Sequence, residues 1–66
     1  MTEKDFYKKE GEECVAELIQ YHKEHGGTPS EMDIWMAANY FWNYDGRDIE
    51  LEKGRIYGEV MSGISQ

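Results

Sequence analysis

A run of eleven residues without a charged side chain, residues 34–44, most constrains how this chain can fold. The run combines aromatic, aliphatic and methionine residues with two asparagines, so every side of a helix built from it would be largely apolar. Such a helix belongs at the centre of a structure, because its sides favour contact with other apolar groups over water. In a chain of 66 residues only two further segments remain to cover it. We therefore predict a single small helical domain over residues 1–66, with an aromatic-rich central helix.

The sequence TPSE at residues 28–31 predicts where the central helix begins. Thr28 suits the N-cap, Pro29 suits the first helical position, and Glu31 stands three residues after the cap, where it would complete a capping box. The helix is then expected to start at Pro29 and to continue to about Tyr44, before an Asp-Gly turn. Two apolar stripes follow from its spacing. The first comprises Ile34, Trp35, Ala38, Phe41 and Trp42, and the second comprises Met32, Met36, Tyr40 and Asn43.

The first segment, from about Thr2 to His25, also has the periodicity of a helix. Its apolar stripe consists of Cys14, Val15, Leu18, Ile19 and His22. Gly11 interrupts the pattern, so we expect the part before Glu10 to fray or kink. The pair Gly26-Gly27 predicts the end of the helix, because glycine readily adopts the left-handed conformation that follows a helix C-terminus.

The last segment, residues 47–66, fits two structures. A helix capped by Asp45 would gather most of its apolar residues on one side. A β-hairpin that turns at Lys53-Gly54 would use one of the glycines that a helix tolerates poorly. Two strands alone make an unstable sheet, so the helix is favoured. The predicted fold class is all-α, a small three-helix domain, and the alternative is two helices plus a C-terminal β-hairpin.

Nothing in the sequence predicts catalytic, cofactor-binding or metal-binding residues. A single cysteine, Cys14, excludes an internal disulfide and fits a reducing compartment, so a cytoplasmic location is expected. Three neighbouring glutamates would disfavour its thiolate, which argues against a nucleophile. His22 and His25 have no further ligands at the spacing of a metal site. We therefore expect a protein that is not an enzyme and needs no cofactor.

The net charge of −7 limits the kinds of partner that this chain is expected to bind. Nucleic acids and anionic membranes would repel such a chain, and the uncharged run is far shorter than the roughly 20 residues that span a bilayer. A protein partner is thus expected. Four glutamates recur every seven residues along the first helix, with Glu13 beside them: Glu3, Glu10, Glu17 and Glu24. This acidic ridge is either a solvated face or a surface that occupies a basic, nucleic-acid-binding groove of another protein.

Size and charge together suggest a function hypothesis. The chain is comparable in both to phage-type inhibitors of host defence, such as anti-CRISPR and anti-restriction proteins, and so would bind and inhibit or modulate a larger protein. The alternative is a homodimeric helical regulator or adaptor that self-associates through its aromatic helix. The predicted partner-binding residues are Trp35, Met36, Tyr40, Trp42, Tyr44, Glu10, Glu13 and Glu17.

Overall fold

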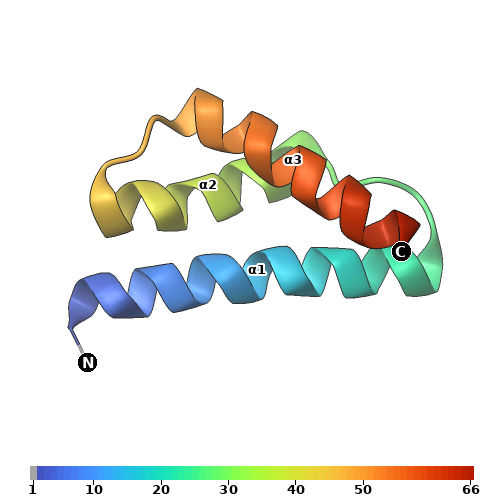
Figure 1. Cartoon of the computed structure of the whole chain (residues 1–66), viewed down its shortest axis with the longest axis horizontal. Coiled ribbons are helices and arrows are strands. Elements are labelled where there is room, and N and C mark those ends of the chain that lie inside the picture. Colours follow the sequence, from blue (N-terminus) through green and yellow to red (C-terminus); the bar gives the residue numbers. More distant parts are fainter. Residues whose placement is uncertain (1) are drawn as a thin grey trace.

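The computed structural model describes residues 2–66 and contains three helices (Figure 1). They are α1 (Glu3–His25), α2 (Glu31–Asp45) and α3 (Ile49–Ser65). α1 runs along the length of the molecule, and α2 and α3 both pack on one side of it (Figure 1). The prediction of a small all-α, three-helix fold is confirmed. The hairpin alternative is wrong, because residues 49–65 form one helix.

Side-chain caps begin α1 and α3. Thr2 and Asp5 form a reciprocal capping box, in which each side chain accepts a hydrogen bond from the backbone N–H of the other residue. At α3 the carboxylate of Asp48 accepts from the N–H of Leu51 at 3.0 Å. The prediction that Asp45 caps this helix is wrong, since Asp45 is still the last residue of α2.

The start of α2 lies two residues later than the sequence predicted. Ser30, not Thr28, is the N-cap, and its hydroxyl accepts from the N–H of Asp33 at 3.2 Å. Pro29 is buried and precedes the cap, so it is not the first helical residue. Glu31 therefore opens the helix and does not complete a capping box. Both Thr28 and Ser30 are good caps by residue type. Ser30 is the cap because its hydroxyl is the one that reaches an unpaired N–H, that of Asp33.

All three helices contribute to the hydrophobic core. Its buried residues are Val15, Ile34, Ala37, Ala38, Phe41, Ile56 and Val60. The stripe predicted on α1 does face this core, since Val15 and His22 are buried and its other three members are half-buried. The helix also ends at His25 as predicted, with Gly26 at φ 82°.

The stripe predicted on α2 is wrong at its two tryptophans. The buried face of this helix consists of Ile34, Ala37, Ala38 and Phe41. Successive residues are rotated by about 100°, which places Trp35 and Trp42 on the flank of that face. Their exposed fractions are 45% and 50%. Ala37 and Ala38 of this face are both fully buried, and only Ala38 belonged to the predicted stripe.

Gly11 serves packing and does not break α1. The helix continues through this position, so the predicted fraying or kink is absent from residues 3–25. A Cβ at Gly11 would lie 2.9 Å from the ring of Phe41, so only glycine allows the ring to rest on the backbone of α1. At Gly63, a Cβ would similarly lie 2.6 Å from Cδ1 of Ile19, which shows how closely the end of α3 approaches α1.

The glycines of α3 allow a matched prediction. Beyond the adjacent residues and the nearby backbone of α3 itself, a Cβ at Gly54 or Gly58 would meet no described atom within 4 Å, so these glycines only weaken the helix. We expect Gly54→Ala and Gly58→Ala each to raise the free energy of unfolding by about 0.5–1 kcal/mol. Gly11→Ala should lower it by about 1–3 kcal/mol through overpacking. Urea denaturation of the three variants measures these changes in the free energy of unfolding. A Gly11→Ala variant more stable than the parent would contradict the packing of Phe41 on Gly11.

Candidate protein-binding surface

The side of α2 that faces away from the core is exposed and apolar. We call Met32, Trp35, Met36 and Trp42 the outer face of α2; these four residues lie within about one third of the helix circumference. Their exposed fractions range from 45% to 64%. An exposed cluster of large apolar side chains is typical of an interaction site.

Two asparagines separate these side chains without adding charge. The side-chain amide of Asn39 donates to the backbone oxygen of Trp35 at 2.9 Å, and that of Asn43 donates to the backbone oxygen of Asn39 at 3.0 Å. Both amides therefore bond within α2. The outer face offers a partner aromatic and thioether groups together with the amide oxygens.

The two tyrosines predicted to bind a partner lie elsewhere. Tyr40 and Tyr44 are half-buried and are one turn apart on the flank of α2. The ring centroid of Tyr44 is 5.7 Å from Nζ of Lys8 and 5.8 Å from Cζ of Arg47. Tyr44 thus contacts cations of its own chain. Met32 lies on the outer face although it was not among the predicted binding residues; it belongs to the second apolar stripe that the sequence predicted.

A groove between α1 and α2 adjoins the outer face. It has a volume of about 430 Å³ and is lined by Cys14, Glu17, Leu18, Tyr21, Asp33 and Met36. Met36 belongs to both surfaces, so the groove and the outer face are continuous. Of the predicted site residues, the fold brings Met36 and Glu17 together here. Asp33 was missed, because only the packing of α2 on α1 reveals that it lies near Glu17.

Burial and the carboxylates around this groove raise the pKa of the Cys14 thiol. Burial is the largest cause of its raised pKa, and the charges of Glu17, Asp33 and Glu10 raise it further. The sequence prediction of a disfavoured thiolate was thus correct in direction. The prediction rested on Glu12, Glu13 and Glu17, and of these only Glu17 is among the carboxylates that raise this pKa.

The shifted pKa predicts slow alkylation of Cys14. In the folded protein at pH 8, its reaction with iodoacetamide should be several-fold slower than in the urea-unfolded chain, because less thiolate is present. Mass spectrometry at timed intervals measures both rates. Equal rates would show that neither burial nor the carboxylates protect the thiol.

The remaining glutamates of the acidic ridge differ in their surroundings. Glu13 lies 4.0 Å from Nζ of Lys9, at the limit of an ion pair. Glu24 accepts a hydrogen bond from the side chain of Gln20 at 2.7 Å, and Glu3 from the hydroxyl of Tyr7 at 3.5 Å. Among the predicted binding carboxylates, Glu17 lines the groove and both Glu17 and Glu10 raise the pKa of Cys14.

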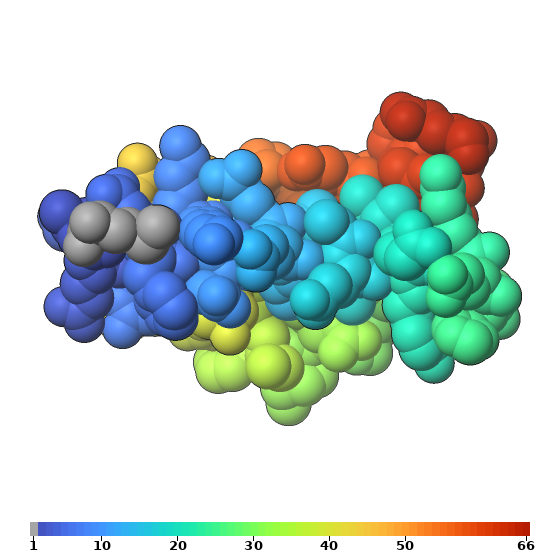
Figure 2. Space-filling view, turned by 90° about the horizontal axis from the view of Figure 1, so that it is seen from below, coloured from blue at the N-terminus to red at the C-terminus, as the bar shows by residue number. Residues whose placement is uncertain are grey.

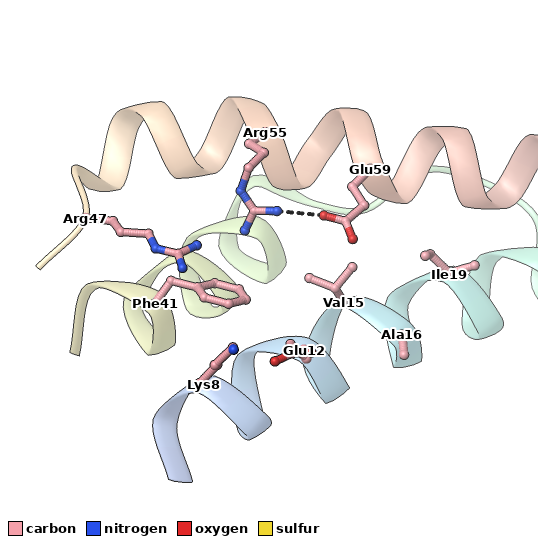
Figure 3. Close-up of a pocket in the computed structure, with 9 residues that line it drawn as sticks. All are labelled: Lys8, Glu12, Val15, Ala16, Ile19, Phe41, Arg47, Arg55 and Glu59. Carbon is pink, nitrogen blue, oxygen red and sulfur yellow. Dashed lines mark hydrogen bonds and ion pairs between the residues drawn. The ribbon is translucent and has the colours of Figure 1, made fainter. Parts of the chain in front are cut away.

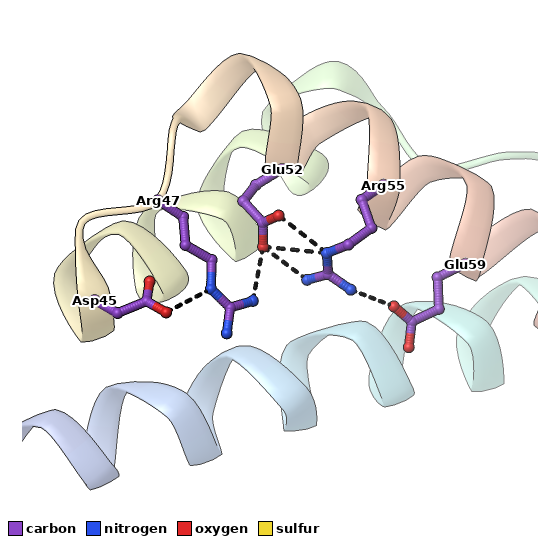
Figure 4. Close-up of polar contacts among 5 residues, drawn as sticks. All are labelled: Asp45, Arg47, Glu52, Arg55 and Glu59. Carbon is purple, nitrogen blue, oxygen red and sulfur yellow. Dashed lines mark hydrogen bonds and ion pairs between the residues drawn. The ribbon is translucent and has the colours of Figure 1, made fainter.

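A charged network joins the end of α2, the loop that follows it and α3 (Figure 4). It lies on the core side of α2, where Arg47 and Arg55 contact the ring of Phe41. Arg47 binds Asp45 at 2.7 Å and Glu52 at 3.1 Å, while Arg55 binds Glu52 at 2.9 Å and Glu59 at 2.7 Å. Glu52 is the buried centre of the network. Hydrogen bonds from Arg55 are the largest cause of its lowered pKa, followed in the same direction by those from Arg47. The carboxylates on this side are neutralised within the chain.

The same arginines flank the ring of Phe41 in a second cavity of about 410 Å³ (Figure 3). The Cζ atoms of Arg47 and Arg55 lie 5.1 and 5.0 Å from the ring centroid, within the range of cation–π contacts. Lys8 and Glu12 line the cavity from α1. Because its arginines already bind carboxylates of the chain, we interpret this region as stabilising the fold.

The histidines have no neighbours suited to a metal. Within residues 2–66, no three or more histidine, cysteine, aspartate or glutamate side chains are grouped to hold an ion. His22 is buried and donates through Nδ1 to the backbone oxygen of Gly26 at 3.0 Å, which joins α1 to the following loop. The ring of His25 lies against Tyr21, with centroids 4.6 Å apart.

Two further findings bear on the class of protein. Among residues 2–66, no helix is both long enough and apolar enough to cross a membrane. Comparison of the chain with known protein families, with curated proteins and with solved structures finds no match.

Proposed function

We propose that this protein is a small, acidic, non-enzymatic binding protein that docks the outer face of α2 onto a larger protein and thereby inhibits or modulates it. The observation that carries the proposal is the exposure of two tryptophans and two methionines on one uncharged helix face. Tryptophan and methionine are enriched at the centres of protein interfaces, where they bury much area with little loss of polar hydration.

Charge favours a different protein over a second copy of this chain. Met36 of the outer face also lines the groove that contains Glu17 and Asp33. A symmetric dimer through this face would therefore bring the carboxylates of two chains together, each chain carrying a net charge of −7. Like charges brought together in an interface oppose association. A partner with basic residues around an apolar patch has the complementary charge, and a nucleic-acid-binding protein offers such a surface.

The homodimeric regulator remains the second proposal, because the uncharged outer face could pair with itself. Sedimentation at micromolar concentration in low and high salt separates the two. A monomer of 7.8 kDa under both conditions would remove the homodimer. A dimer that strengthens with salt would support it, since salt screens the repulsion between the chains.

The docking surface is tested by a double variant, Trp35→Ser with Met36→Ser. With the parent chain as bait in an extract of its native host, the captured partner is purified and its affinity for each variant is measured. We expect the double variant to weaken binding by about 30-fold or more, as loss of a central anchor does. It should retain the helical circular dichroism of the parent, because both side chains are about half exposed.

Leu51→Ser provides the matched control. Leu51 lies on α3 and is 75% exposed, so this change also removes an exposed apolar side chain. Binding by this variant should equal that of the parent. Normal binding by the double variant, or an equal loss in the control, would contradict the assignment of the outer face.

A further inference from the structure

The groove between α1 and α2 combines apolar walls with two carboxylates that come from different helices. Cys14, Leu18 and Met36 supply apolar surface, while Glu17 stands on α1 and Asp33 on α2. Figure 2 shows α1 along the face of the molecule, with α2 projecting beside one of its long edges. We propose that this groove receives a basic side chain, an arginine or lysine, from the protein partner that binds the outer face of α2. This inference rests on the proposed function and adds the chemistry of the partner.

The carboxylates of the groove are not neutralised by the chain. Within residues 2–66, neither Glu17 nor Asp33 takes part in an ion pair. In the charged network the arrangement is the reverse, because Arg47 and Arg55 neutralise the buried Glu52. The charge that the fold leaves unbalanced next to the outer face is therefore negative.

An arginine or lysine matches both properties of the groove. Its aliphatic stem can lie on apolar side chains while its charged end remains near carboxylates. Here the stem would contact Leu18 and Met36, and the cation would lie between Glu17 and Asp33. The negative field at this point also acts on Cys14, whose pKa both carboxylates raise.

Other occupants fit less well. A purely apolar side chain would remove water from two carboxylates without giving either a hydrogen-bond donor, which is unfavourable. A second copy of the chain would bring its own net charge of −7 toward the same carboxylates. The groove therefore favours a partner segment in which a basic residue stands beside apolar ones.

The proposal is tested with synthetic peptides as probes. The first is an amphipathic helix of about five turns made of leucine and lysine, and the second has glutamine in place of every lysine. Each peptide carries a fluorescent label and is titrated with the full chain by anisotropy. We expect the lysine peptide to bind about tenfold or more tightly than the glutamine peptide. It should shift the backbone amide resonances of Cys14, Leu18 and Met36 in the folded protein.

A matched pair of double variants separates the groove from the general field of an acidic protein. Glu17→Gln with Asp33→Asn removes both carboxylates of the groove, and Glu3→Gln with Glu24→Gln removes two elsewhere. Both variants change the net charge from −7 to −5, and each removes one acidic residue from the first turn of a helix. The groove variant should lose about tenfold in affinity for the lysine peptide, and the control variant less than threefold.

Three outcomes would overturn the proposal. Equal losses in the two variants would mean that the peptide responds only to net charge. Equal affinity for both peptides would point to an apolar occupant, and shifted resonances confined to α3 would place the peptide elsewhere. If the partner's affinity falls with Trp35→Ser and Met36→Ser but not with the groove variant, the proposed function stands and the groove assignment fails.

Discussion

Phe41→Ala should lower the free energy of unfolding by about 3–5 kcal/mol, the usual loss when a buried phenylalanine is truncated. Phe41 is 5% exposed, and its ring lies on the backbone of α1 at Gly11. Arg47 and Arg55 lie against the same ring, so its loss also removes two cation–π contacts. Stabilities of about 0.05–0.15 kcal/mol per residue are typical, and for a chain this short the change would remove most of the total.

Urea denaturation followed by circular dichroism measures this loss, and Trp35→Ala is its control. Both changes remove an aromatic side chain from α2, but Trp35 is 45% exposed. The Trp35 variant should lose less than half as much stability. If the two losses were equal, the division of α2 into a buried and an outer face would be incorrect.

Glu52→Gln should lower the free energy of unfolding at neutral pH by about 2–3 kcal/mol. The substitution preserves shape but leaves Arg47 and Arg55 without the buried charge that both contact. Removing one member of a fully buried ion pair lowers the free energy of unfolding by a larger amount. Here the side chains of the arginines are 36% and 41% exposed, so water replaces part of the lost interaction.

The lowered pKa of Glu52 gives this effect a defined pH dependence. In the folded protein, hydrogen bonds from Arg55 favour the charged carboxylate, so the unfolded chain binds more protons at this residue. Its stabilisation is complete above the ordinary glutamate range, about pH 4.3, and is lost as the pH falls through the lowered pKa. The difference between the parent and Glu52→Gln should therefore shrink on acidification below about pH 4.

Urea midpoints between pH 7 and pH 3 test this, with Glu50→Gln as control. Glu50 pairs with Lys53 at 3.5 Å, but its side chain is 82% exposed. Exposed pairs contribute little, so this control should follow the parent at every pH. A constant difference between Glu52→Gln and the parent down to pH 3 would show that the carboxylate is not held in its charged form.

Much of the fold follows from local sequence signals, because helix periodicity and the exit glycine of α1 act within a few residues of chain. The start of α2 was missed for an equally local reason. Thr28 and Ser30 are both good caps by residue type, and the sequence does not show which hydroxyl meets a free backbone N–H. The third segment required a tertiary argument, namely that two strands alone would find no partner sheet.

Long-range packing accounts for what the sequence could not predict. By residue type, Gly11 weakens a helix. Its role in packing follows only from the fold, in which the ring of Phe41 lies against the backbone at this position. The groove has the same origin, because Glu17 and Asp33 are sixteen positions apart in the sequence and meet only through the packing of α1 on α2. The sequence also does not show which neighbouring residues of α2 the core buries. The core buries Ala37 and Ala38 completely, and Trp35 is left 45% exposed.

The division of α2 into two faces has a consequence for how this protein can evolve. One set of positions holds the fold together, while a separate set on the same helix meets solvent. Substitutions at exposed positions usually change stability by no more than about 0.5 kcal/mol. Variation on the outer face therefore costs the fold less than variation on the buried face. In a lineage under pressure to follow a changing target, such a helix can acquire new binding specificities on an unchanged scaffold, and the same property makes it a site for building combinatorial libraries.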